Sequence, residues 1–268
     1  DGNTYNAGTA SATDKNSGEV TIEYSADNGA TWTTNPGTIT AKNVSDSVTV
    51  QVRVTSANYE GSVTGTQELK ITKREVKLTS ASDEKVYDGT ALTNGTVTVT
   101  GDGFVTGEGA SYNVTGSQTN VGKSDNSFTY TLNAGTIANN YIITTEVGKL
   151  EVTPVTAPVT VKVYEASSNV TYDGQPHSIH GYTKMEADNP LYAATTANIK
   201  VTETAAWTAT GTDAGEYEVG IEPGNFQNTN GNFTNVVFEI VHGKLVIEKA
   251  KTVEIELKGN TNTVTYNG

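Results

Sequence analysis

Val170-Thr171-Tyr172-Asp173-Gly174 occurs three times in the chain with small changes, and this recurrence decides how the sequence is divided. It appears earlier as Val86-Tyr87-Asp88-Gly89 and later as Val264-Thr265-Tyr266-Asn267-Gly268. The tyrosines are 85 and 94 residues apart. Self-similarity at such a spacing indicates tandem structural repeats, each a small domain.

Two further markers recur in the same order and set the boundaries of the repeats. The first marker is a polar turn, and the second is a closing apolar stretch. The turn occurs as Lys42-Asn43-Val44-Ser45, Thr119-Asn120-Val121-Gly122 and Thr212-Asp213-Ala214-Gly215, and the closing stretch as Glu68–Ile71, Gly148–Val152 and Gly243–Ile247. The markers predict a first repeat at 1–73 that lacks its opening strand, a second repeat at 74–153, a third at 154–250 with an insertion near 181–207, and the opening strand of a further repeat at 251–268.

The periodicity within the repeats is that of β-strands. Apolar and polar residues alternate in Val48–Val54, Val97–Thr100 and Phe128–Leu132, as in half-buried antiparallel strands. Thr fills 46 of the 268 positions and Gly 27, and turn dipeptides recur at the short spacing of a sandwich. We expect an all-β chain of tandem β-sandwiches. The joints between repeats are short, which favours an elongated rod.

The segment Asp213-Ala214-Gly215-Glu216-Tyr217 resembles the tyrosine corner of immunoglobulin domains, in which the tyrosine hydroxyl returns to a backbone group upstream. Together with the Tyr-Asp-Gly motif and the closing Gly-Lys-Leu stretch, the whole chain is similar to the Ig-like "YDG" or MBG-type repeats of bacterial, Gram-positive-like, cell-surface proteins and adhesins. This resemblance implies extracellular display at the cell wall, a stalk role and no catalytic residues.

Charge and composition exclude several classes of function. The net charge is −13, from 17 basic and 30 acidic residues, whereas a nucleic-acid binder needs a basic face. The same charge disfavours an anionic membrane surface, and no apolar run reaches the roughly 18 residues that insertion requires. Cysteine is absent, which excludes disulfides, thiolate metal sites and a cysteine nucleophile. We predict no enzyme activity and no cofactor, and we assign no residue as a metal ligand.

Ser25-Ala26-Asp27-Asn28-Gly29-Ala30-Thr31-Trp32 matches the "Asp box" of sialidase propellers. In those enzymes the box is a structural turn remote from catalysis. We expect Asp27 to accept backbone hydrogen bonds, Gly29 to adopt a positive φ and Trp32 to pack beneath the turn. A sialidase also needs an arginine cluster, and this chain has two arginines. The box therefore predicts a structural hairpin.

Histidines and carboxylates are the candidate metal ligands of the chain. The three histidines are His177, His180 and His242, and Pro176 and Gly181 bracket the first two, which predicts a surface loop. Acidic loop residues of the second repeat, Asp83-Glu84, Asp102, Glu108 and Asp125-Asn126, lack the dense spacing of a calcium loop. A solvated acidic surface is the favoured interpretation, and a structural calcium stays open.

Aromatic residues raise the question of ligand binding. Tyr87, Tyr172 and Tyr266 share one repeat position, which indicates a common packing role. Tyr182, Tyr192 and Trp207 lie in or beside the insertion, where the repeat pattern does not require them. These three are the candidate ligand-binding residues, although core packing is the simpler explanation.

The function predicted from the sequence is a structural stalk that spaces or presents a binding function, with neighbouring repeats as partners. One alternative is a module that binds a glycan or a host surface protein through the third repeat. Another is head-to-tail self-association, in which residues 251–268, with alternating Val253, Ile255 and Leu257, complete the first repeat of the next copy as a donated strand.

Overall fold

The computed structural model describes residues 1–252 and 256–268 and confirms the all-β class. The described strands form small sheets of two or three, and the only described helical segments are short 3-10 turns. The chain divides into two compact units, Asp1–Lys85 with Ala91–Val152, and Val86–Thr90 with Thr153–Gly268. Among the described residues, each sheet takes all its strands from one of the ranges 1–73, 74–153 and 154–250. The ranges keep the names first, second and third repeat.

The first repeat is built on an antiparallel three-stranded sheet with an added short pair. In β4 the buried Val50 and Val52 alternate with less buried residues, as the sequence pattern predicted. They pack with Tyr24, whose hydroxyl accepts a hydrogen bond from Ala10 N at 2.7 Å. The sheet has the order β2 (Val20–Ser25), β4 (Val48–Ser56), β5 (Val63–Leu69), and the pair is β1 (Tyr5–Asn6) with β3 (Thr40–Ala41); η1 (Pro36–Thr38) and η2 (Val44–Asp46) are the 3-10 turns.

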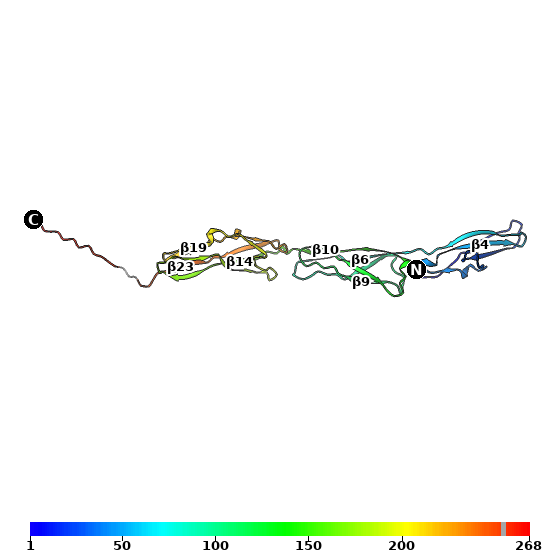
Figure 1. The fold of residues 1–268 in the computed structure, drawn as a ribbon, viewed down its shortest axis with the longest axis horizontal. Coiled ribbons are helices and arrows are strands. Elements are labelled where there is room, and N and C mark those ends of the chain that lie inside the picture. The colour runs from blue at the N-terminus through cyan, green and yellow to red at the C-terminus, as the bar shows by residue number, and fades with distance from the viewer. Residues whose placement is uncertain (253–255) are drawn as a thin grey trace. The chain divides into compact units, whose positions relative to one another are not determined.

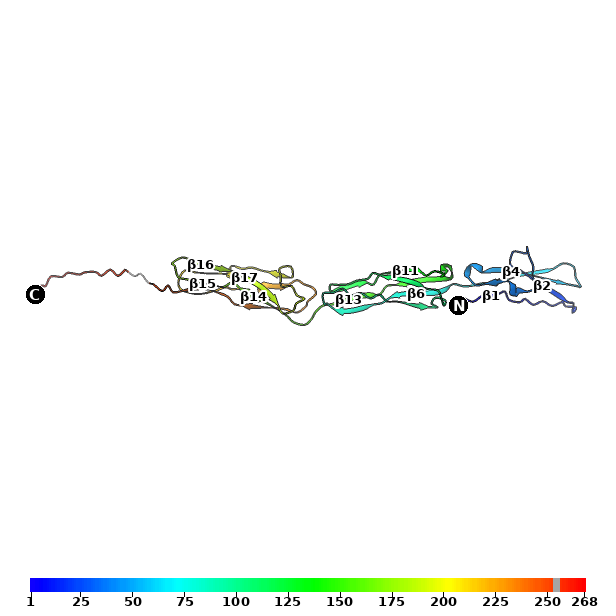
Figure 2. The same ribbon diagram turned by 90° about the horizontal axis from the view of Figure 1, so that it is seen from below.

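The second repeat places its core between strands on opposite sides. Val76 and Leu78 of β6 are fully buried, and Tyr112 and Phe128 pack against them from the β9–β11 pair. Figure 2 shows β11 on the side opposite β6 and β13. Its sheets are β12 (Tyr141–Glu146), β6 (Arg74–Ser80), β8 (Val97–Gly101); β10 (Gly122–Asp125), β13 (Lys149–Thr153), β7 (Asp83–Val86); and β11 (Phe128–Leu132) with β9 (Ala110–Val114); η3 is Ala138–Asn140.

The third repeat has the largest core, and its central members are Trp207, Phe226 and Phe233. Strands β14, β19 and β23 are labelled in Figure 1, and β15, β16 and β17 in Figure 2. Its sheets are β17 (Tyr182–Ala187), β14 (Val159–Glu165), β22 (Val236–Val241); β15 (Ser168–Thr171), β23 (Lys244–Glu248), β20 (Gly215–Glu218); β16 (His177–His180) with β19 (Thr208–Gly211); and β18 (Ile199–Val201) with β21 (Phe226–Asn228); η4 is Ala205–Trp207 and η5 is Pro223–Asn225.

The three stretches predicted as antiparallel strands, β4, β8 and β11, do pair antiparallel. The sequence pattern did not predict that early strands of the second and third repeats also have parallel neighbours from late in the same repeat. In the second repeat β6 runs parallel to β12, and in the third repeat β14 runs parallel to β22 and β15 to β23. Parallel neighbours need a long crossover connection. The chain supplies one, because most of each repeat lies between its first and last strands.

Two other sequence predictions, a loop at His177 and His180 and an opening strand at 251–268, can be compared with the structure, together with the insertion. His177 and His180 lie on strand β16, so the predicted loop is wrong there; Ser178 and Ile179 between them pair with β19 in a regular register. The insertion contains β17 and β18, joined by turns over residues 188–198. In the tail, residues 256–268 form no strand, and Val253 and Ile255 of the predicted opening strand lie outside the described residues.

Candidate functional site

The Asp box of the first repeat has the predicted geometry. Asp27 Oδ1 accepts hydrogen bonds from the Thr31 backbone N–H at 2.8 Å and from Ser25 Oγ at 2.7 Å. Gly29 has φ +90°, a conformation that glycine adopts without a Cβ clash. The Trp32 indole N–H donates to the Gly29 carbonyl at 3.0 Å. The polar groups of this turn are hydrogen-bonded to one another, as expected of a structural turn.

Charge reinforces this turn. The Thr31 hydroxyl and backbone N–H, followed by Ser25, lower the pKa of Asp27 from 3.8 to about 2. The Arg53 guanidinium lies 4.1 Å from the Trp32 ring centroid and forms an ion pair with Glu23 at 2.7 Å. Both of these Arg53 contacts are with residues of its own repeat, which indicates a structural role for the arginine.

The Tyr-Asp-Gly motif forms the same turn in two repeats. Asp88 Oδ1 accepts a hydrogen bond from Thr90 N, two residues on, and Asp173 Oδ1 accepts one from Gln175 N, both at 2.9 Å. The following glycine has φ +80° at residue 89 and +76° at residue 174. The hydrogen bond from Gln175, with a smaller effect of His177, lowers the pKa of Asp173. The motif thus encodes a rigid turn at the end of the opening strand.

The tyrosine of each motif is anchored by its backbone. Tyr87 N donates to the Thr153 carbonyl and Tyr172 N to the Glu248 carbonyl, both at 2.8 Å. Each acceptor is the last residue of the closing strand of its repeat. The two tyrosines share a backbone position, but the common packing role predicted for the motif is wrong, because Tyr172 is 41% exposed and Tyr266 94% exposed while Tyr87 packs against a core.

Tyr217 has the hydrogen bond expected of a tyrosine corner. Its hydroxyl donates to the Asp213 carbonyl, four residues upstream, at 3.0 Å. Its ring covers Gly211 so closely that an added Cβ would lie 2.1 Å from a ring carbon, and it lies 3.7 Å from the corresponding position of Gly215. The missing side chain of Gly211 makes room for the ring, which holds the turn before β20.

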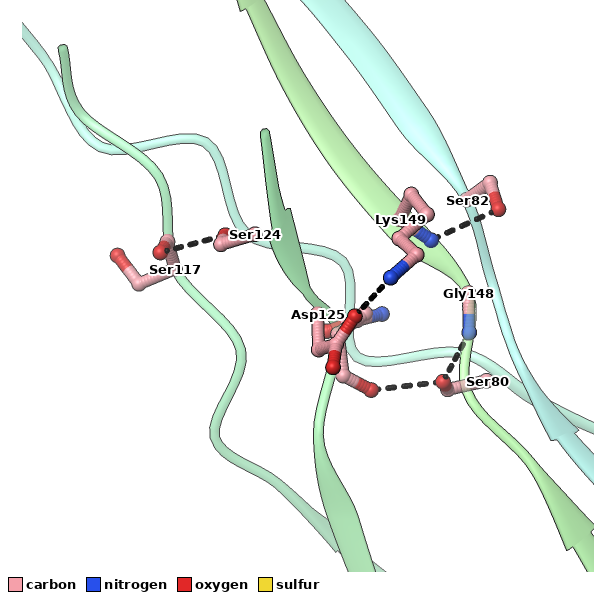
Figure 3. A network of polar contacts seen from close by, with 8 residues as sticks. Ser80, Ser82, Ser117, Ser124, Asp125, Gly148 and Lys149 are labelled. Carbon is pink, nitrogen blue, oxygen red and sulfur yellow. Dashed lines mark hydrogen bonds and ion pairs between the residues drawn. The ribbon is translucent and has the colours of Figure 1, made fainter. Parts of the chain in front are cut away.

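In the second repeat a side chain at the end of β6 caps the start of the closing strand β13. Ser80 Oγ accepts a hydrogen bond from Gly148 N at 2.9 Å and donates to the Asn126 carbonyl at 2.7 Å (Figure 3). Asn126 is fully buried, and its amide donates to the carbonyls of Ala81 at 2.9 Å and Asn94 at 2.8 Å. These hydrogen bonds join the end of β6 to the segments around residues 94, 126 and 148, while Asn126 Oδ1 is buried with no hydrogen-bond partner in the described residues.

Glu165 takes the same place in the third repeat. Its carboxylate, fully buried, accepts hydrogen bonds from Gly243 N at 2.9 Å and Ile221 N at 3.0 Å, and His242 Nδ1 lies 3.3 Å from it. Sequence reasoning missed this residue, because Ser80 and Glu165 share a position but no chemical type. The buried glutamate makes three contacts with its own repeat, so its role is structural.

The ionic contacts around Ser80 lie at the surface. Lys149 Nζ pairs with Asp125, and both side chains are more than half exposed (Figure 3). Ser124 Oγ donates to the Ser117 carbonyl at 3.0 Å. Exposed pairs of this kind contribute little to stability. These surface contacts therefore add little to the stability of the second repeat.

The candidate ligand-binding aromatics of the third repeat lie in its core. Trp207 is 2% exposed and Tyr192 is 3% exposed. Tyr182 meets Trp207 edge-on with ring centroids 6.0 Å apart, and Trp207 stacks on Phe226 at 5.8 Å. The Tyr192 hydroxyl donates to Asn228 Oδ1 at 2.9 Å. Their faces contact protein, so this placement lends no support to a sugar-stacking role.

Histidines and acidic residues also have protein partners. His177 Nε2 lies 2.9 Å from Asp173 Oδ1, and His180 Nε2 lies 3.0 Å from Glu203 Oε1. In the second repeat Glu108 accepts the Tyr141 hydroxyl at 2.7 Å. Among the other calcium candidates, Asp83 accepts from Glu84 N and Asn94, and Asp102 from Glu75 N.

The first repeat carries a surface hollow that the sequence did not indicate. It has a volume of about 370 Å³ and lies where β4 and β5 meet residues 13–15. Tyr59 and Val63 on its rim are 55% and 75% exposed, and Asp14, Lys15 and Glu60 make the lining mixed. It is shallow and brings together no catalytic set.

A scan of the chain against protein-family models found no matching family, and a search of curated proteins found no match. In the described part of the chain, no helix is long and apolar enough to cross a membrane.

Proposed function

We propose that the chain is the stalk region of a bacterial cell-surface protein or adhesin, built from tandem Ig-like sandwiches that space or present a binding function. The observation that carries the proposal is the repeated scaffold. In successive repeats a Tyr-Asp-Gly turn with positive φ at glycine follows the opening strand, and the tyrosine N–H binds the end of the closing strand at 2.8 Å.

The described side chains support a structural role over a binding one. The Asp box, the Tyr217 corner and the Ser80 and Glu165 caps direct their polar atoms into their own repeats. The aromatics of the insertion fill the core of the third repeat. An acidic surface, with net charge −13, suits an exposed stalk because like charges oppose aggregation.

The joints favour an elongated arrangement. Strand β5 ends at Leu69 and β6 begins at Arg74, while β13 ends at Thr153 and β14 begins at Val159. Joints of four or five residues leave neighbouring domains little freedom to fold back on each other. This stiffness is what a stalk requires.

Small-angle X-ray scattering of the full chain tests the proposal. A compact globule of this length would have a radius of gyration of about 18 Å. A stalk gives a clearly larger radius and a distance distribution with a long tail, at all protein concentrations. A radius near the globular value would contradict it. Labelling of intact producing cells by antibodies against the chain tests surface display separately.

A further inference from the structure

The Tyr87 ring belongs by its packing to the unit that follows it in the sequence. Val86–Thr90 group with Thr153–Gly268 in the second compact unit. The Tyr87 ring meets Phe233 edge-on, with centroids 5.7 Å apart and planes at 76°. A Cβ at Gly89 would lie 3.4 Å from Leu191 Cδ2. The Tyr-Asp-Gly turn of the second repeat thus contacts the third repeat through its tyrosine and its glycine.

The surface that receives Tyr87 is held in place by the third repeat itself. Phe233 is 2% exposed and meets Tyr192 edge-on at 5.1 Å. Asn228 links the two residues, because its amide donates to the Phe233 carbonyl at 2.8 Å and its oxygen accepts the Tyr192 hydroxyl at 2.9 Å. Leu191 stands at the rim and is 42% exposed. Leu191, Tyr192 and Phe233 are called the aromatic seat.

The third repeat presents the same turn, with its tyrosine partly exposed to solvent. Tyr172 N and Tyr87 N have equivalent acceptors at 2.8 Å, and Gly174 and Gly89 have nearly the same φ. The Tyr172 side chain is 41% exposed, whereas Tyr87 is partly buried against the core of the third repeat. Val264-Thr265-Tyr266-Asn267-Gly268 repeats the motif once more, so the sequence pattern of a following repeat resumes in the tail.

We propose that the Tyr172-Asp173-Gly174 turn is a docking site for a further repeat of the same kind, whose aromatic seat takes the Tyr172 ring. The partner is defined by chemistry: an aliphatic residue at the rim and two edge-on aromatic rings beneath. The Tyr-Asp-Gly motif then couples each repeat to the next, because its tyrosine is part of the packing of its neighbour. This inference does not depend on the stalk role.

A chain extended by one repeat tests the proposal. Residues 175–250 are appended after Gly268, so that 251–268 and the added segment make a complete repeat with an aromatic seat. We expect tetranitromethane to nitrate Tyr172 at least severalfold more slowly in the extended chain than in the parent chain. Tyr172→Ala should lower the melting temperature of the added repeat and leave the parent chain unchanged. Equal nitration rates in the two chains, with the added repeat folded, would overturn the proposal.

A second experiment keeps the proposal falsifiable if the added repeat does not fold. In the parent chain, Tyr87→Ala should lower the melting temperature of the third repeat, with Tyr172→Ala as the matched control at the equivalent turn. Most of that effect should vanish in a Phe233→Leu background, because the ring partner is gone. If the two substitutions lower the melting temperature additively, Tyr87 does not pack against the aromatic seat. That result would contradict the docking role of the motif.

Discussion

Replacing Glu165 tests the role of the buried cap in the third repeat. Glu165→Ala leaves the Ile221 and Gly243 N–H groups without their acceptor. An orphaned buried donor costs about 1–3 kcal/mol, and the Gly243 N–H, which is only partly buried, lies near the lower end of that range. We expect a total loss of roughly 2–4 kcal/mol, which lowers the melting temperature of a domain of this size by at least about 8 °C.

Tryptophan fluorescence provides the assay. The chain has two tryptophans, Trp32 in the first repeat and Trp207 in the core of the third. In a Trp32→Phe background, Trp207 alone reports unfolding of the third repeat during urea or thermal denaturation. Glu165→Gln keeps one accepting oxygen and should lose about half as much stability as the alanine variant.

The matched control is Glu216→Ala, which removes an exposed glutamate that pairs with Lys244. A surface substitution of this kind should change stability by no more than about 0.5 kcal/mol. If Glu165→Ala proves as stable as Glu216→Ala, the cap is not structural and the reasoning is refuted.

Two other predictions concern Asp27 in the first repeat and Gly243 in the third. The pKa of Asp27 is depressed to about 2, so its stabilisation is complete above the unfolded value of 3.8 and is lost as the pH falls from about 4 to 2. Asp27→Asn should be less stable at pH 7 and show a smaller acid-induced fall in melting temperature; equal falls in both chains would contradict this. Gly243→Ala places a Cβ 2.3 Å from the Ala166 carbonyl oxygen and should cost about 1–3 kcal/mol. Gly224→Ala, with no atom within 4 Å of the new Cβ, is its control, and denaturation midpoints that match would refute the clash.

Much of the fold could be predicted from short patterns in the sequence. The alternation in Val48–Val54 and Phe128–Leu132 located β4 and β11, and in β4 it also indicated the buried face. The Asp box and the Tyr217 turn were predicted from residue type, since their hydrogen bonds close within five residues of sequence. Such contacts leave a mark in a short window of sequence.

Contacts between residues far apart in the sequence could not be predicted from such patterns. Glu165 contacts residues 56 and 78 positions away, and no motif announces it. The repeat pattern did not predict Trp207 and Tyr192 as core residues, because an insertion can bring core residues of its own. The Tyr-Asp-Gly motif specified a turn, but the partner of its tyrosine, Phe233, lies 146 residues further on. Which surface a ring meets depends on the folded neighbour.

Single-molecule force spectroscopy of the full chain, held at both ends, tests most directly whether it is a series of independently folded repeats. The three ranges hold 73, 80 and 97 residues, so their extended lengths are about 260, 290 and 350 Å, before the folded lengths are subtracted. We predict three separate unfolding events with increments near these lengths. A single event that releases about 900 Å, or extension without any force peak, would contradict the account.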